Sequence, residues 1–181
     1  MAAMGGSVAR RYAKALFAIA LERGIFELLG RQLNELADLW NDSQELRQTL
    51  ENPVFKLSQK RAVLQGLMPR LAPARPVQSM ALLLLERGRI AILPAVARAY
   101  EEMSDEKLGR VRALIKSAQP LDIASETEIR KALERRTGKK VIMTTVIDAT
   151  LLGGVIAQVA GMELDGSVSS RLHTLKQRLL N

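Results

Sequence analysis

The stretch GRVRALIKSA at residues 109–118 marks the point where the hydrophobic period of the chain changes. Apolar Val111, Ala113 and Ile115 alternate with the other residues of the stretch, which is the period-2 pattern of a half-buried strand. Before Gly109 the apolar residues follow helical spacing instead. The sequence therefore predicts two domains, a helical one over 1–106 and a smaller α+β one over 107–181.

Residues before this stretch predict six helices joined by short loops, the pattern of a compact bundle. The apolar face of the first helix is expected to consist of Val8, Tyr12, Leu16 and Ile19. The second helix carries Phe26, Leu29, Leu33, Leu36 and Trp40 at alternating spacings of three and four. Further helices are expected near 43–51, 58–68, 76–87 and 90–103, with Pro76 in the first turn of the fifth.

The second part predicts a short sheet with two helices. SETE at 125–128 has the pattern of a capping box, with Ser125 as the N-cap of a helix that ends at Gly138. VIMTTVI at 141–147 predicts a strand, and LLGGVIAQVAGMEL at 151–164 predicts one more strand interrupted by glycines. A terminal helix is expected to use Val168, Leu172, Leu175 and Leu179. The predicted fold class is mostly α, a six-helix bundle followed by a small α+β domain.

The glycines of the second part do not form a nucleotide-binding motif. A phosphate loop needs Gly-x4-Gly-Lys-Ser/Thr between a strand and a helix, and Gly153, Gly154 and Gly161 lack this spacing and that of a dinucleotide fingerprint. Glycines within a strand usually mark a bulge or a close backbone approach. Asp165 and Gly166 are expected to form a turn, with Ser167 as the N-cap of the terminal helix. These glycines are predicted to be structural.

Catalytic chemistry finds little support in the sequence. The chain has no cysteine and one histidine, His173, so His/Cys metal clusters are excluded and a Ser–His triad with Ser167 or Ser170 is disfavoured. The acidic residues of the loops and strand ends are interpreted as solvated turn residues; they are Asp122, Asp148, Glu163 and Asp165. We expect no enzyme activity, no cofactor and no metal.

The charge of the chain is uneven, and it leaves two classes of partner open. Of the net charge of +8, residues 107–181 carry +6, from 13 Lys/Arg against 7 Asp/Glu. A basic patch suits nucleic acid or an acidic protein. Aromatic residues are only 3% of the chain, which disfavours base stacking. No apolar run is long enough for a membrane span, and the first residues lack the pattern of a secretory signal, so a soluble cytoplasmic protein is expected.

Four segments taken together resemble the delta subunit of the rotary ATP synthase, called OSCP in mitochondria. They are ARRYAKALF at 9–17, LLLERGRIAILPAVARAYEEM at 83–103, KSAQPL at 116–121 and IDATLLGGVIAQVAGMELDGSVSSRLHTL at 147–175. The resemblance covers nearly the whole chain. Two departures are Ser169–Ser170, where the family often has Arg-Gly, and Gln158, which replaces a residue that is often basic.

The resemblance implies a non-catalytic stator protein that joins the catalytic head to the b subunits of the peripheral stalk. It also implies a location at the cytoplasmic face of the bacterial inner membrane, reached only through the complex. A basic nucleic-acid-binding module is the alternative.

The resemblance further implies two binding surfaces. An N-terminal helix of an alpha subunit is expected in a groove between the first and fifth helices, at Tyr12, Ala13, Leu16, Phe17, Met80, Leu83, Leu84 and Arg87. Of these, Leu16 and Leu83 are expected to contribute to the bundle core, and Ala13 and Phe17 to the groove lip. The stalk is expected on the terminal helix, at Val168, Arg171, Leu172, Leu175, Lys176, Arg178 and Leu179.

Overall fold

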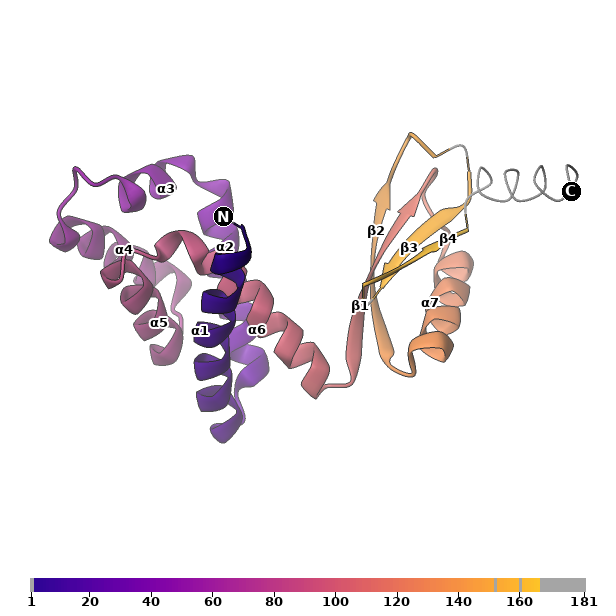
Figure 1. The fold of residues 1–181 in the computed structure, drawn as a ribbon, viewed down its shortest axis with the longest axis horizontal. Helices are drawn as coiled ribbons and strands as arrows, with labels where there is room; N and C mark the ends of the chain where they lie inside the picture. Colours follow the sequence, from indigo (N-terminus) through magenta and orange to yellow (C-terminus); the bar gives the residue numbers. More distant parts are fainter. Residues whose placement is uncertain (1, 152, 160, 167–181) are drawn as a thin grey trace, which may run out of the picture. The chain divides into compact units, whose positions relative to one another are not determined.

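The computed structural model describes residues 2–151, 153–159 and 161–166. The chain forms two compact units, with the boundary between Ser104 and Asp105 (Figure 1). The first unit is helical, and the second contains a four-stranded sheet. Each unit has its own hydrophobic core.

The predicted six helices of the first part are confirmed. They are α1 (Ala2–Glu22), α2 (Phe26–Asp42), α3 (Gln44–Glu51), α4 (Leu57–Leu71), α5 (Arg75–Glu86) and α6 (Leu93–Lys107), with a 3₁₀ turn η1 (Ile90–Ile92) before α6. Pro76 lies in the first turn of α5, as predicted, where its missing N–H costs no helical hydrogen bond. Two predicted ends are wrong: α4 continues past Pro69, and α6 ends four residues beyond Met103.

The buried face of α1 differs from the predicted one. Ala9, Ala13, Leu16 and Ala20 are almost completely buried, whereas Ile19 is 40% exposed. The prediction followed the large residues Val8, Tyr12 and Ile19, and the face that they define is rotated by part of a helical turn from the buried one. Alanines form most of the true face because their small side chains let α1 approach its neighbours closely, and close packing decides which residues become buried.

Three aromatic rings contact one another in the first unit. The Tyr100 ring makes an edge contact with Phe17, at 5.3 Å between centroids, and Phe17 makes another with Phe26, at 6.1 Å. The Tyr100 hydroxyl donates a hydrogen bond to the Phe26 carbonyl at 2.9 Å. A side chain at Gly30 would place its Cβ 3.3 Å from the Tyr100 ring, so this position favours glycine. The cluster joins α1, α2 and α6.

Burial of Tyr100 makes the free energy of unfolding depend on pH in the alkaline range. Desolvation raises its pKa to about 12, so the unfolded chain ionises at this residue at lower pH than the native one. Stability should be fully present below about pH 10 and should fall as pH rises toward 12, by up to roughly 1.4 kcal/mol per pH unit. Tyr100→Phe should cost about 1 kcal/mol at pH 7 through the lost hydrogen bond, and it should lack this alkaline loss. Urea unfolding of both proteins at pH 7, 10 and 11 measures the difference. If the free energy of unfolding fell equally with pH in both proteins, the alkaline loss could not be assigned to Tyr100.

The second unit is a mixed sheet with the strand order β2-β1-β3-β4. The strands are β1 (Arg110–Ser117), β2 (Lys140–Ile147), β3 (Val155–Val159) and β4 (Met162–Asp165). The parallel pair β1 and β2 is connected by α7 (Ile123–Thr137). β3 pairs antiparallel with β1, and β4 pairs antiparallel with β3. The predicted alternation in β1 is confirmed, since Ala113 and Ile115 are buried.

The glycine-rich segment contains two strands, so the prediction of one interrupted strand is wrong. Gly161, at a φ of 77°, lies in the turn between β3 and β4. Gly153 and Gly154 lie in the bend before β3, not within a strand. Asp165 is the last residue of β4, and the turn predicted after it continues into residues outside the described ones. The N–H of Gly166 bonds to the Val155 carbonyl, and a Cβ at this position would lie 3.2 Å from that oxygen, so the backbone of Gly166 lies close to β3.

The N-terminus of α7 also corrects a prediction. The helix begins at Ile123, and its N-cap is Asp122, whose carboxylate accepts a hydrogen bond from the N–H of Ser125 at 2.7 Å. Ser125 therefore lies inside the first turn and is not the cap. The predicted end at Gly138 is confirmed, with a φ of 67° that suits glycine. The predicted terminal helix and the Ser167 cap lie outside the described residues.

Candidate partner-binding surfaces

A hollow of about 500 Å³ lies between α1 and α5, which pack against each other in the first unit. Its floor is apolar, since Leu16 and Met80 are almost completely buried, and Ile19 and Leu83 are 40% and 39% exposed at its sides. The residues that line it are Ala15, Leu16, Ile19, Arg23, Arg75, Pro76, Ser79, Met80 and Leu83. An apolar hollow between two helices is a shape that accepts an amphipathic helix.

Three residues predicted for the alpha-subunit surface line this hollow, namely Leu16, Met80 and Leu83. The core expectation for Leu16 is confirmed, but that for Leu83 is wrong, because α5 turns this side chain outward. Ala13 was expected at the groove lip, but it is fully buried in the bundle core, as is Leu84. These two side chains support the helices that form the hollow.

The remaining predicted residues lie around the same helices. Phe17 is half-buried and belongs to the aromatic cluster. Tyr12 is half-buried, and its hydroxyl accepts a hydrogen bond from Arg89 at 3.4 Å. Arg87 is exposed at the C-cap of α5.

Sequence patterns alone did not reveal most of the α5 side or the cations of the hollow. Arg75, Ser79 and Leu83 follow each other at four-residue spacing, as do Ile19 and Arg23 on the α1 side, so each series follows one helical face. Arg23 and Arg75 are both exposed. The signal was present in this spacing, but the alanine face of α1 had to be known before the outer face could be assigned.

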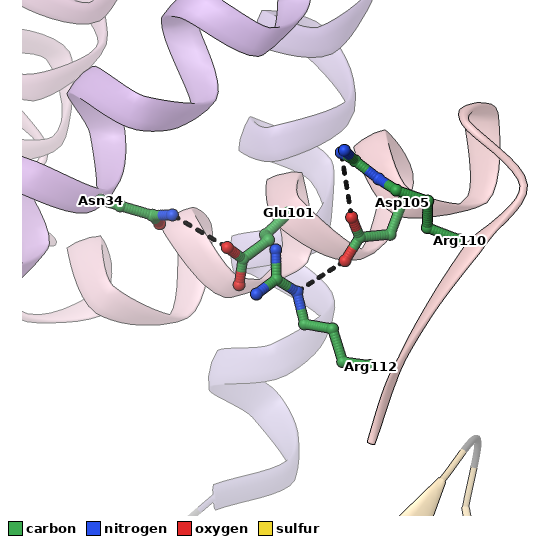
Figure 2. A network of polar contacts seen from close by, with 5 residues as sticks. All are labelled: Asn34, Glu101, Asp105, Arg110 and Arg112. Atoms are coloured by element: carbon green, nitrogen blue, oxygen red, sulfur yellow. Dashed lines mark hydrogen bonds and ion pairs between the residues drawn. The ribbon is translucent and has the colours of Figure 1, made fainter. Parts of the chain in front are cut away.

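Figure 2 shows three polar contacts that involve α6, one at Glu101 and two at Asp105. In the first unit, the Asn34 side chain donates to the Glu101 carboxylate at 3.0 Å. In the second unit, the buried Asp105 carboxylate accepts from Nε of Arg112 at 2.6 Å and lies 3.3 Å from Nη2 of Arg110. Both ion pairs of Asp105 span the turn at Gly109, whose φ is 62°. A carboxylate held between two guanidinium groups is a structural element rather than a general acid.

The carboxylates of Asp122 and Asp148 accept hydrogen bonds from residues close by in the sequence. Hydrogen bonds from Ser125 lower the pKa of Asp122, and hydrogen bonds from Thr150 lower the pKa of Asp148. Both groups are therefore stabilised as anions in turns. Over the described ranges, no group of three or more His, Cys, Asp or Glu side chains is placed to hold a metal ion. No helix in the same ranges is long and apolar enough to cross a membrane.

Comparison with known proteins identifies the family. The family model of the "ATP synthase delta (OSCP) subunit" matches residues 8–179. The chain belongs to the ATP synthase delta (OSCP) family. It is 40% identical over 174 residues to ATP synthase subunit delta of Anaeromyxobacter dehalogenans, with 96% of this chain and 97% of the relative covered. It is 35% identical to the same subunit of Citrifermentans bemidjiense over 173 residues, with 96% of each covered.

A solved structure agrees with this family assignment. The fold resembles a chain in the cryo-EM structure of the Toxoplasma gondii mitochondrial ATP synthase hexamer, with a TM-score of 0.74 and 27% identity. The match covers 96% of this chain and 97% of that chain. The similarity therefore extends over both units.

Members of the delta (OSCP) family are non-catalytic stator components of the F-type ATP synthase. Membership of this family favours a role in a protein assembly over the alternative of nucleic-acid binding. It also means that the functional surfaces are those that contact other subunits. The terminal residues predicted for the stalk, from Val168 to Leu179, lie outside the described residues.

Proposed function

We propose that this chain is the connector between the alpha/beta catalytic head and the b subunits of the peripheral stalk. The first unit binds the head, and the second unit binds the stalk. The connection holds the head still while the rotor turns, so that torque drives ATP synthesis. The observation that supports this proposal most directly is the apolar hollow between α1 and α5, which has the form of a helix-binding groove and no catalytic groups.

The occupant of the hollow is an amphipathic helix from the N-terminus of an alpha subunit. Leu83 and Ile19 are the apolar side chains exposed at its sides, so they gain most from being covered. Burial contributes about 2.5 kcal/mol for each 100 Å² of apolar surface removed from water. The exposed cations Arg23 and Arg75 orient the helix through its acidic residues.

Substitution of the exposed apolar residues tests this site. Leu83→Asp and Ile19→Asp should each weaken binding of an alpha-subunit N-terminal peptide at least about tenfold, since a carboxylate would be desolvated against the peptide. Because these positions are exposed, the free energy of unfolding should change by only about 0.5 kcal/mol. Isothermal titration calorimetry of the full chain with the peptide measures the affinity.

Val54→Asp is the matched control, since Val54 is 81% exposed, belongs to the same unit and does not line the hollow. It should leave the affinity unchanged. Leu84→Asp is unsuitable, because this side chain is fully buried and its replacement would unfold the bundle. Normal peptide binding by both Leu83→Asp and Ile19→Asp would exclude the hollow as the site.

The stalk contact is assigned to the second unit and the terminal segment. The segment carries Val168, Leu172, Leu175 and Leu179 at helical spacing. Arg171, Lys176 and Arg178 accompany this stripe and supply part of the +6 charge of residues 107–181. The stripe packs against stalk helices, and the cations increase the association rate.

Removal of residues 167–181 should detach the stalk subunits and leave binding of the alpha peptide intact, because the hollow lies entirely in the first unit. Neutralising Arg171, Lys176 and Arg178 should slow association at low salt and matter little at high salt. Surface plasmon resonance against the soluble part of the b subunits provides both rates. A truncated chain that binds the b subunits normally would remove the terminal segment from the contact.

The proposed location follows from the complex. The chain is peripheral at the cytoplasmic face of a bacterial inner membrane and reaches the membrane only through its partner subunits.

A further inference from the structure

The two faces of the sheet in the second unit have different surroundings. On one face, Ala113, Ile115 and Val141 are buried and form a core with Leu133 and Ile129 of α7. The strand register places alternate residues of β1, β2 and β3 on the other face. Within the described part of the second unit, no helix contributes to a core on that second face.

We call this second face the open face. The apolar residues at its centre are Leu114, Ile142, Val146 and Ile156. None of these residues belongs to the core of either unit. Val146 is 46% exposed, and the other three are partly exposed. Leu114 belongs to β1, Ile142 and Val146 belong to β2, and Ile156 belongs to β3. The apolar residues therefore extend across three adjacent strands. Strands are about 4.8 Å apart, so the centre is about as wide as one α-helix.

Cations accompany this apolar centre. Lys116 lies between Val146 and Ile156 in the register, and Lys140 precedes Ile142 by two residues on the same face of β2. Lys140 is exposed. Two acidic residues lie further out on β4: Asp165 is beside Ile156 in the register, and Glu163 accepts a hydrogen bond from Gln158 at 2.7 Å. The side of the open face formed by β1 and β2 is therefore basic.

We propose that the open face binds an acidic amphipathic helix of a partner subunit. The apolar side of the helix covers Leu114, Ile142, Val146 and Ile156, and its carboxylates meet Lys116 and Lys140. This inference rests on the proposed stalk contact of the second unit and adds a surface on the sheet to that contact.

Charge distinguishes this partner from the chain's own terminal segment. Residues 167–181 contain Arg171, Lys176 and Arg178 and no acidic residue. Placing this segment over Lys116 and Lys140 would bring like charges together, whereas an acidic helix pairs with them. The occupant is therefore the partner helix rather than the terminal segment.

Substitutions on the open face test the proposal with the full chain and the soluble part of the stalk b subunits. Val146→Asp and Ile142→Asp should each weaken binding at least about tenfold. Ile123→Asp is the matched control, because Ile123 is 85% exposed at the start of α7 and does not lie on the sheet. It should bind as the unmodified chain does. The double variant Lys116→Glu, Lys140→Glu should associate more slowly at low salt and lose most of this difference at high salt.

The outcomes separate the inference from the proposed function. Normal binding by the open-face variants, with loss of binding on removal of residues 167–181, would overturn the inference and leave the stalk contact in place. Failure of the unmodified chain to bind the b subunits would instead overturn the proposed stalk contact itself.

A labelling experiment tests the terminal segment as an occupant. The chain has no cysteine, so Val146→Cys gives a single site for a maleimide reagent. Its labelling rate should be the same in the full chain and in a chain ending at Gly166, and the b subunits should slow it. Faster labelling of the shortened chain without b subunits would show that the terminal segment covers the open face and would overturn the proposal.

Discussion

The buried ring of Tyr100 is the contact on which the first unit depends, because it joins three helices at one point. The chain has only one Trp, two Tyr and three Phe, and Phe17, Phe26 and Tyr100 meet in this cluster. The hydroxyl bond to the Phe26 carbonyl satisfies the one polar atom of the ring. Gly30 leaves the space that the ring needs. With so few large residues, the position of α1 relative to α2 and α6 is set largely by this cluster.

The position of α1 in turn determines the candidate head-binding surface. Its alanines face the core, so the side that carries Ala15 and Ile19 faces α5 and forms one wall of the hollow. On α5, Leu84 points into the core, and its neighbour Leu83 points outward. One residue therefore stabilises the helix, and the next is available to a partner.

The sequence allowed the element types to be predicted well, because the change of period at Gly109 and the spacing of Leu29, Leu33 and Trp40 are strong local signals. It did not allow the buried face of α1 to be predicted, since alanines such as Ala13 become buried only through tertiary packing. The N-cap was assigned to Ser125 although Asp122 serves, because both residue types favour that position. The two strands β3 and β4 were merged because the turn at Gly161 has a single glycine as its local signal.

The same limit applies to the candidate surfaces. Resemblance to the delta (OSCP) family implied a groove between the first and fifth helices, and an apolar hollow lined by Leu16, Met80 and Leu83 lies there. Outward-facing residues such as Ile19 could be selected only after the core was known. The open face was not foreseen as an apolar surface, because the alternation in β1 does not say which residues of β2 and β3 lie beside it.

The central claim is that this chain binds the catalytic head and the peripheral stalk at the same time. Sedimentation of the purified head with the soluble b subunits, with and without this chain, tests it most directly. We expect the b subunits to sediment with the head only when the chain is present, because its two units bind different partners. Competition between the head and the b subunits for the chain, or co-sedimentation that does not require the chain, would contradict the account.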